Sequence, residues 1–518
     1  MRERSQNLAK PAIVLVAHMA VVAAIPSVVS LPKASAAERP NIVLVMADDM
    51  GHSQTGYRNH PLLKTPHLND LATRGLRLDH FYAAGPVCSP TRASVLTGRT
   101  HERTGVDSHG YALRRQERTL AQLLRDAGYD TGHFGKWHLN GLRGPGAPLF
   151  AEDRYAPGVF GFDHWLSVSN FFDRDPILSR LGDWEEFAGD SSEIVMDQML
   201  AWAANRSDSK RPFFAVVWYG TPHSPFRADA DDVALLRQRS EASAAIVDQI
   251  KQDSQNHHGE LVAMDRSLGA LKKGLQSMGK MDNTLIWFTS DNGGLPGIEP
   301  STTTPLRGNK GQLYEGGLRV PCVMHWPNGI EAGRISNFPA CATDIAPTVL
   351  DVAGIAAKAI DGLIQPVDGI SLTSVITGMD TTRRTKPLGF RYAGGSAIID
   401  DGWKLLRLQK NKKKNAITEE LYHLAADPNE TRNLISQEVA QAERMRALLD
   451  TFNTSVLESR AGKDYPSGRV EADHVEPRFW IELPEYQAHF DAWADRPEYA
   501  NWVERGRKAS AKKAKATR

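Results

Sequence analysis

Residues 41–46, Asn-Ile-Val-Leu-Val-Met, decide the fold class of this chain. An apolar run of this length is typical of a strand that is buried on both faces, as in the middle of a parallel sheet. Two further apolar runs, at 212–218 and 284–289, predict strands of the same kind. Helical patterns separate these runs. The alternation predicts an α/β fold with a large mixed, mostly parallel sheet sandwiched by helices.

Two of the helical patterns are well defined. The helix expected at 120–127 has Thr119 to cap its start and Gly128 to end it. A longer helix is expected where apolar residues recur at helical spacing, at Leu261, Met264, Leu268, Leu271 and Leu275. That stripe indicates core packing and carries no chemistry.

Two other stretches, 165–192 and 225–259, show no regular pattern. They are interpreted as insertions that shape a binding surface, because long irregular connections often carry function. Ser191 or Ser192 is expected to cap a helix that reaches Trp202.

The composition is that of an ordinary globular protein. The 518 residues are enough for two domains, or for one large domain with a smaller companion. The net charge is +1, so no nucleic acid is expected as a partner. The one strong charge bias is at the Lys- and Ala-rich end, where residues 506–518 are predicted to be a disordered basic tail.

The N-terminal segment predicts export. Basic residues precede an apolar run from 11 to about 31, and Ala34-Ser35-Ala36 offers small residues for cleavage. Residues 1–36 are therefore interpreted as a signal peptide, with an uncleaved membrane anchor as the alternative. The mature protein is expected to be periplasmic or secreted, without stable membrane insertion.

Acidic and amide side chains follow two of the predicted strands. Asp48 and Asp49 come after the first, and Asp291 and Asn292 come after the strand at 284–289. Because ligands bind at the carboxyl ends of strands in open α/β sheets, these groups are expected to meet in one crevice. Any single Asp-Asp pair also fits an ordinary turn. Three carboxylates and one amide oxygen suit Ca²⁺ or Mg²⁺, whereas the spacings typical of zinc sites do not occur.

Cys88 precedes a predicted helix for which Ser89 is the expected N-cap and Pro90 the first residue. A group at this place would feel the positive end of the helix dipole, and Arg92 adds a cationic fork that suits oxyanions. The alternative is a small buried thiol. The other two cysteines, Cys322 and Cys341, either form a disulfide or are buried free thiols, which leaves Cys88 without a partner.

Five motifs, in order along the chain, carry a resemblance to a known family. They are Cys88-Ser89-Pro90-Thr91-Arg92 with Leu96-Thr97-Gly98-Arg99, Gly135-Lys136-Trp137-His138-Leu139, Thr221-Pro222-His223, Ser290-Asp291-Asn292-Gly293 and Gly308-Asn309-Lys310-Gly311. From Asn41 to about Asn433, the chain resembles the type I sulfatases of the alkaline phosphatase superfamily.

The resemblance implies that a maturase converts Cys88 to formylglycine, whose hydrate carries two hydroxyls, one of which attacks sulfur. It also implies one divalent cation, with Ca²⁺ favoured over Mg²⁺. The implied ligands are Asp48, Asp49, Asp291 and Asn292, together with the formylglycine at position 88.

The resemblance, together with the expected chemistry, assigns roles to further residues. Arg92, Lys136 and Lys310 would stabilise the negative charge that develops on the sulfate group. His223 is the expected general acid for the leaving alcohol, and His138 the base whose action on the second hydroxyl expels sulfate. The family often has one more polar contact to the sulfate, for which Ser169 or Asn170 is a candidate.

The resemblance also implies how the chain is divided. Residues 37–386 would form the catalytic domain. Residues 387–505 would form a C-terminal subdomain with a small antiparallel sheet and helices, in which 397–406 reads as a turn between strands.

A sulfated saccharide is the favoured substrate, on the strength of the export signal and the long insertions. Phe171, Phe172 and Trp184 are candidates for stacking on sugar rings, or else belong to the core. The alternatives are an aryl sulfatase and a phospho- or phosphonate monoester hydrolase of the same superfamily. A non-catalytic glycan-binding relative would be expected to lack Cys88, Arg92 or a metal carboxylate, and all of these are present.

Overall fold

The computed structural model describes residues 39–206, 208, 210–355, 362–379, 383–411 and 416–516. The predicted signal peptide, 1–36, lies outside this part of the chain. Of the helices within it, none combines the length and apolar character needed to cross a membrane.

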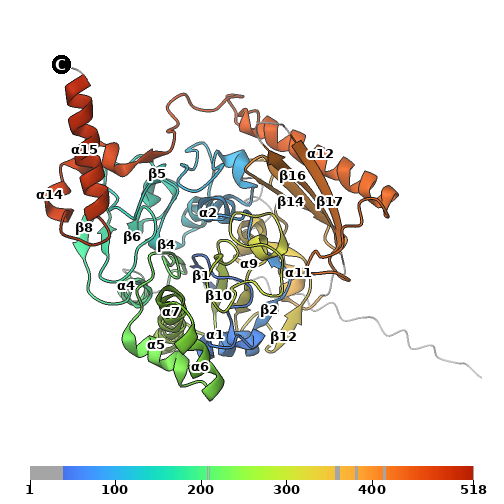
Figure 1. The fold of residues 1–518 in the computed structure, drawn as a ribbon, viewed down its shortest axis with the longest axis horizontal. Helices are drawn as coiled ribbons and strands as arrows, with labels where there is room; N and C mark the ends of the chain where they lie inside the picture. The colour runs from blue at the N-terminus through green and yellow to red at the C-terminus, as the bar shows by residue number, and fades with distance from the viewer. Residues whose placement is uncertain are drawn as a thin grey trace, which may run out of the picture.

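A ten-stranded sheet runs through the described part of the molecule (Figure 1). Its middle strands are parallel: β10 (Thr284–Ser290), β1 (Asn41–Ala47), β9 (Phe213–Trp218), β4 (Asp130–Lys136) and β6 (His164–Val168). Outside them lie β11 (Val323–His325), β2 (Leu76–Leu78) and β12 (Arg334–Ser336) on one side, and β7 (Ile177–Arg180) and β8 (Asp183–Glu186) on the other. The prediction of a mixed, mostly parallel sheet is confirmed.

Side chains alternate between the two faces of β1 and so reach two separate cores. Ile42, Leu44 and Met46 belong to one hydrophobic cluster, and Val43 and Val45 belong to the other. Burying each side chain of this kind stabilises the fold by about 1.5–3 kcal/mol. The apolar run at 41–46 therefore holds both layers of helices on the sheet.

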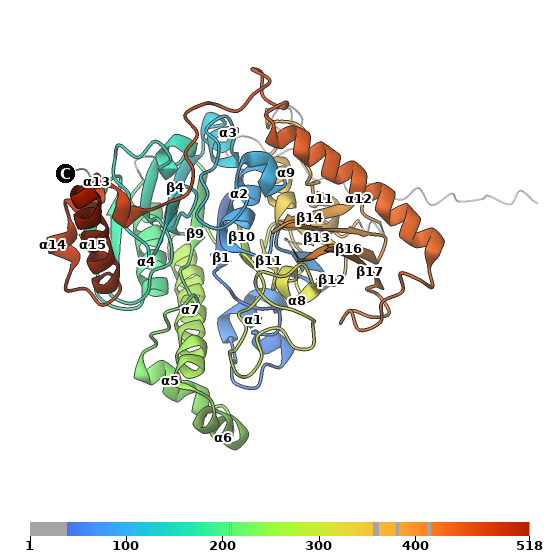
Figure 2. The same ribbon diagram turned by 45° about the horizontal axis from the view of Figure 1, so that its top comes forward.

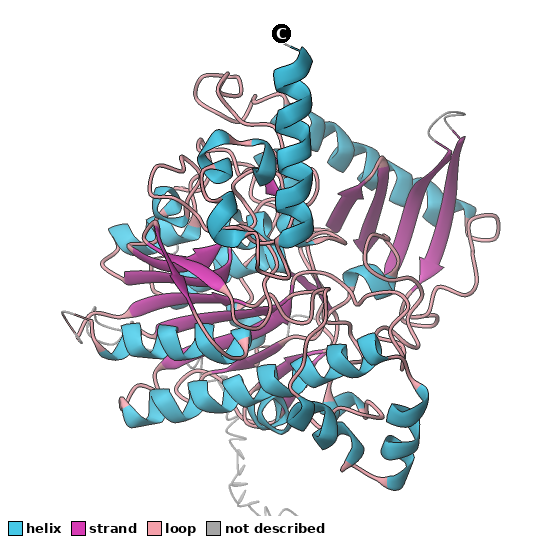
Figure 3. Cartoon of the chain, turned by 60° about the vertical axis from the view of Figure 1, so that its left-hand side comes forward, coloured by secondary structure: helices cyan, strands magenta, loops and turns pink. Residues whose placement is uncertain are grey.

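Helices cover both faces of the sheet (Figure 3). One face packs against α1 (Pro66–Thr73), α4 (Ser191–Ala204) and α7 (Gln252–Ser277), and α7 carries the predicted stripe from Leu261 to Leu275. The other face packs against α2 (Cys88–Thr97), α3 (Leu120–Asp126) and α9 (Ile345–Val352). The shorter elements are β3 (Phe81–Tyr82), β13 (Ala340–Cys341), α8 (Glu315–Leu318), α11 (Thr373–Ile376), η1 (Gly56–Arg58), η2 (His101–Thr104), η3 (Pro157–Phe160) and η4 (Ala342–Asp344).

A second, antiparallel sheet lies beside the main one, as predicted. It consists of β14 (Leu388–Tyr392), β15 (Gly395–Asp400), β16 (Trp403–Asn411) and β17 (Ala416–His423), with α12 (Val439–Arg460) packed on it. The predicted turn between β15 and β16 is formed by Asp401 and Gly402. Both residues have positive φ, 51° and 77°, as a tight hairpin turn requires.

The chain then returns to the main sheet as a C-terminal segment, residues 475–516 (Figure 2). It contains β18 (Arg478–Phe479), η5 (Trp480–Glu482), α13 (Pro484–Gln487), α14 (Phe490–Trp493) and α15 (Ala500–Ala516). Strand β18 pairs in parallel with β5 (Leu142–Arg143). Helix α15 extends to Ala516 and so includes most of the stretch 506–518 that was predicted to be a basic tail; Ala and Lys both favour helix.

The two stretches without a sequence pattern are also ordered. The first contains the hairpin β7–β8, and the second contains α5 (Ala230–Arg237) and α6 (Glu241–Gln249). These elements are too short for a periodic pattern to stand out. Helix α4 is capped by Asp190, whose carboxylate accepts hydrogen bonds from the backbone N–H groups of Ser192 and Glu193, so the predicted serine cap is wrong.

The predicted cap of α3 is confirmed and can be tested. Thr119 Oγ1 accepts a hydrogen bond from Gln122 N at 3.2 Å and donates one to Phe160 O at 2.6 Å. Replacing Thr119 by alanine is expected to lower the free energy of unfolding by about 1–2 kcal/mol in urea denaturation. Thr119→Ser, which keeps the hydroxyl, should lose much less. Equal losses in the two variants would contradict the assignment.

Candidate active site

Helix α2 places Cys88 at its first residue. Its N-cap is Val87, which makes no side-chain cap, so the expected capping by Ser89 is wrong. Ser89 Oγ instead donates to His138 O at 2.7 Å and accepts from Gly110 N at 2.9 Å. The hydroxyl therefore ties the helix start to the neighbouring His138 segment. Every residue of α2 is buried, and Cys88 is only 2% exposed.

The acidic groups that follow β1 and β10 meet at the start of α2. The two strands are in parallel register, with Ala47 opposite Ser290, so the residues after each strand become neighbours. Cys88 Sγ lies 3.3 Å from Asp48 Oδ1. One potential ligand atom from each of Asp48, Asp49, Cys88 and Asp291 lies within 4.8 Å of the others. The structure thus brings the residues predicted for one crevice into one cluster.

Each carboxylate in this cluster is paired with a cation. Arg92 donates to Asp291 Oδ2 through Nη2 at 2.6 Å and Nε at 3.1 Å. Lys136 Nζ lies 2.5 Å from Asp48 Oδ2, and Lys310 Nζ lies 2.7 Å from Asp49 Oδ2. Three carboxylates therefore face three cations, all in a poorly solvated place where such charges interact strongly.

Burial and these charges shift the pKa values in opposite directions. Burial, followed by the charge of Asp48, raises the pKa of Asp291 to about 7. Burial would also raise the pKa of Asp48, but Lys136 and the other cations outweigh it and hold that pKa far below its usual range. Burial and Asp48 raise the pKa of the Cys88 thiol well above its usual value. Cys88 is consequently a neutral thiol and not an activated thiolate.

The two predicted catalytic histidines line the same cavity as Cys88. His223 Nδ1 lies 2.6 Å from Ser224 O, its Nε2 lies 3.8 Å from Asp49 Oδ2, and its ring stacks on Phe171 at 4.6 Å. Burial, followed by the charge of Lys310, lowers the pKa of His223 to about 4. Burial and Lys136 lower that of His138 well below its usual value. Both imidazoles are therefore neutral near pH 7.

The donor set of the cluster fits a hard divalent cation. Asn292 Nδ2 donates to Asp49 Oδ1 at 2.7 Å, which leaves Asn292 Oδ1 buried and without a hydrogen-bond partner among the described residues. A buried amide oxygen of this kind costs free energy unless something binds it. Together with the carboxylate oxygens it provides the ligands that Ca²⁺ and Mg²⁺ prefer.

The cavity over this cluster has a volume of about 400 Å³. Sequence reasoning missed several of its walls, namely His109, Arg143, Tyr392, Phe479 and Trp502. Of the two candidates for an additional polar contact, Asn170 lines the cavity. Ser169 instead accepts a hydrogen bond from Ala147 N through its hydroxyl.

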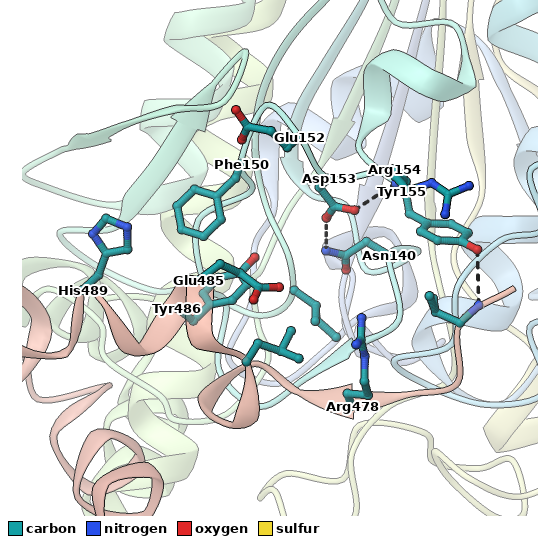
Figure 4. Close-up of a pocket in the computed structure, with 13 residues that line it drawn as sticks. Asn140, Phe150, Glu152, Asp153, Arg154, Tyr155, Arg478, Glu485, Tyr486 and His489 are labelled. Carbon is teal, nitrogen blue, oxygen red and sulfur yellow. Dashed lines mark hydrogen bonds between the residues drawn. The ribbon is translucent and has the colours of Figure 1, made fainter. Parts of the chain in front are cut away.

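A second cavity, of about 500 Å³, is drawn in Figure 4, and residues of the strand pair β5–β18 line both it and the catalytic cavity. Leu142 and Arg478 line the second cavity, whereas Arg143 and Phe479, which follow them, line the first. This alternation is expected of a strand pair with a space on each face. In Figure 4, Arg478 extends from the C-terminal segment toward Asn140.

The remaining predictions concern aromatic residues and cysteines, and their outcomes differ. Phe171 lines the catalytic cavity, whereas Phe172 is 8% exposed and belongs to the core, and Trp184 packs on Trp493. The three cysteines are all free thiols. The disulfide alternative for Cys322 and Cys341 is therefore wrong, and the alternative of two buried thiols is confirmed.

This fold, with an acidic cluster at the carboxyl ends of parallel strands, is that of a hydrolase of the alkaline phosphatase superfamily. Within it the chain belongs to the sulfatase family. The model described as Sulfatase matches residues 40–355, and the model described as N-sulphoglucosamine sulphohydrolase, C-terminal, matches residues 309–455. The protein is therefore a sulfuric ester hydrolase, as its five motifs predicted.

Curated relatives match along most of their length. The chain is 29% identical to N-acetylgalactosamine-6-sulfatase of Canis lupus familiaris over 405 residues, 72% of each chain. It is 28% identical to steryl-sulfatase of Mus musculus over 559 residues, 87% of each chain. It is also 28% identical to the ulvan-active sulfatase of Formosa agariphila over 379 residues, 69% of each.

Solved structures support the fold. The structure of Ps i-CgsB in complex with k-i-k-neocarrahexaose has a TM-score of 0.69 at 22% identity, and the match covers 90% of this chain and 99% of that one. The phosphonate monoester hydrolase of Agrobacterium radiobacter is more distant, with a TM-score of 0.55 at 20% identity and coverage of 82% and 96%.

Proposed function

We propose that the protein hydrolyses sulfate monoesters of sulfated saccharides, through a formylglycine derived from Cys88 and with one bound divalent cation. The observation that carries the proposal is the meeting of Asp48, Asp49, Cys88 and Asp291 within 4.8 Å. Lys310, His138 and His223 line the cavity above them. Relatives named for sulfated saccharides, such as the N-acetylgalactosamine-6-sulfatases, support the substrate class.

The charges of the site suit the two groups that the proposal requires, a divalent cation and a formylglycine. A divalent cation held by Asp48, Asp49, Asp291 and Asn292 would give a balanced cluster an excess of positive charge and so favour a sulfate anion. Ca²⁺ is favoured over Mg²⁺ because it binds sites rich in carboxylates. The hydrate of formylglycine would supply the hydroxyl that attacks sulfur, a role for which the neutral thiol of Cys88 is unsuited.

The cationic side chains of the chain stabilise the reacting sulfate. Lys310 reaches the cavity, whereas Arg92 and Lys136 lie beneath it, fully buried. Arg92 holds the Asp291 carboxylate through two hydrogen bonds and so fixes its orientation. Prearranged charges of this kind stabilise a developing anion without reorganising during the reaction.

The histidines move the protons. Ser224 O orients His223 through Nδ1, which leaves Nε2 to carry the proton for the leaving alcohol. Its pKa of about 4 would rise when an anionic sulfate ester binds beside it. His138 has no hydrogen-bond partner for either ring nitrogen among the described residues, so the neutral ring is ready to accept a proton from position 88.

The proposal also includes export of the protein and a maturase that generates the formylglycine. It further divides the chain into a catalytic domain and a C-terminal subdomain. A boundary near residue 387 is supported by the start of β14 at Leu388. Asn170 is proposed as the additional sulfate contact because it lines the cavity. One N–H of its Nδ2 donates to Gly144 O at 2.6 Å, which leaves the second N–H for a sulfate oxygen.

Initial rates of the matured protein on defined esters test this function. Sulfated mono- and oligosaccharides, 4-nitrophenyl sulfate and 4-nitrophenyl phosphate would be compared at equal concentrations. Release of sulfate from a saccharide is expected to be fastest. Faster release of phosphate would refute sulfatase specificity, and equal or faster turnover of 4-nitrophenyl sulfate would refute the saccharide assignment alone.

A further inference from the structure

Arg143 is a cation in the catalytic cavity, and none of the described residues provides a counter-charge for it. Its Nε is buried and has no hydrogen-bond partner within the described part of the chain. Its guanidinium carbon lies 5.6 Å from the centre of the Tyr111 ring. No carboxylate of a described residue forms an ion pair with it, in contrast to Arg92 and Lys310 in the catalytic cluster.

The surroundings of Arg143 favour an anion. Among the described residues that line the catalytic cavity, none is Asp or Glu. A neighbouring cavity of about 630 Å³ shares Arg143 and Tyr392 with it. The carboxylates of that cavity, on Glu102 and Asp107, are already paired with Arg391 and Arg460. Arg143 therefore lies where the two cavities adjoin, and no carboxylate of a described residue pairs with its positive charge.

Two aromatic side chains of the C-terminal segment complete this wall. Phe479 lies opposite Arg143 in the β5–β18 pair, and its ring is 5.5 Å from that of Trp502. The segment is anchored by the fully buried Trp480, whose Nε1 donates to Pro145 O at 3.1 Å. A side chain at Gly144 would collide with Trp480, because a Cβ there would lie 2.9 Å from its Nε1. The wall is thus held in close contact with β5.

We propose that Arg143, Phe479 and Trp502 form a recognition site beside the sulfate centre for a sugar that carries a second anionic substituent. Aromatic faces pack on sugar rings, and a guanidinium binds a sulfate or a carboxylate through paired hydrogen bonds. The inference rests on the proposed sulfatase function, and it adds that the preferred substrate carries a second negative charge. Arg143 lies within the first family match, whereas Phe479 and Trp502 lie beyond both matches, which end at residues 355 and 455.

The test uses the sulfated monosaccharide that the matured enzyme hydrolyses fastest, in three forms. These are the sugar alone, the sugar with a second sulfate on the ring, and the sugar linked to a uronate. Wild-type enzyme is expected to show kcat/KM about 10- to 100-fold higher for a form with a second anion, mainly through KM. Comparing the last two forms tells whether the second group is a sulfate or a carboxylate.

Arg143→Gln is expected to remove that preference, so that kcat/KM for the forms with a second anion falls to about the value for the monosulfated sugar, with the loss concentrated on the doubly anionic forms. Trp502→Ala should raise KM for all three sugars and keep the ratio between them, because it removes contact area and not charge. Arg432→Gln, at an exposed arginine outside these cavities, is the matched control and should change nothing.

Three results separate the explanations. If Arg143→Gln slows every sulfate ester equally, Arg143 contacts the reacting sulfate and the proposal is overturned. If wild-type enzyme does not prefer a second anion, the proposal is also overturned, although the enzyme remains a sulfatase. If no ester releases sulfate, the proposed function itself fails.

Discussion

Replacing Cys88 by alanine is expected to abolish sulfate-ester hydrolysis, with a fall in kcat of about 10⁴-fold or more. Alanine has no sulfur to oxidise, so no aldehyde and no attacking hydroxyl can form at position 88. The fold should remain, because the change removes one buried atom at the start of a helix whose residues are all packed in the core. Sulfate release and circular dichroism measure the two effects.

Cys341 provides the matched control, since it is also a buried free thiol and is 3% exposed. Cys341→Ala should keep its activity. In denatured wild-type protein, alkylation should label Cys322 and Cys341 but not position 88. A fully active enzyme whose Cys88 is alkylated would contradict the mechanism.

Replacing Asp291 by asparagine is expected to lower kcat/KM about a hundredfold or more. Asp291 Oδ2 accepts two hydrogen bonds from Arg92, and its Oδ1 accepts one from Asp49 N at 3.2 Å. The substitution keeps the shape but removes one of three carboxylates. Binding of Ca²⁺, measured by calorimetry, should weaken because the cluster loses negative charge.

A second buried arginine–aspartate pair separates this effect from lost stability. Arg384 donates to Asp344 from both terminal nitrogens, at 2.7 and 2.6 Å. Asp344→Asn and Asp291→Asn should each destabilise the protein, by up to about 3–5 kcal/mol. Only Asp291→Asn should lose activity below its melting temperature. Equal loss of activity in both would show that stability, and not the cation site, explains the result.

The sequence alone was sufficient to predict the site residues that directly follow buried strands. The runs before Asp48 and Asp291 are apolar throughout, which identifies central strands of a parallel sheet. Once both strands are in one sheet, their carboxyl ends meet, so the acidic cluster follows from the pattern. The motif around Cys88 added the position of the thiol.

Other parts depend on contacts that no local pattern encodes. The pairing of β18 with β5 involves two residues in each strand, too few for any periodicity. Nothing in the local sequence distinguishes Arg143 from an ordinary surface arginine, because its position depends on the pairing with Phe479. The cap of α2 was mistaken because Ser89 has a distant partner, His138 O, that competes with the local cap. For 506–516 the tail was predicted from the charge bias, whereas the helix propensity of Lys and Ala agrees with α15.

The β5–β18 pair has a consequence for the order in which the enzyme is made. Trp480 and its partner Pro145 are 335 positions apart, so β18 leaves the ribosome long after the strand it joins. Cys88, Lys136, His223 and Lys310 are all synthesised before it. The cavity wall formed by Phe479 and Trp502 therefore comes from a segment that contains none of the proposed catalytic groups. Changes in that segment can alter the shape of the cavity without replacing a catalytic side chain.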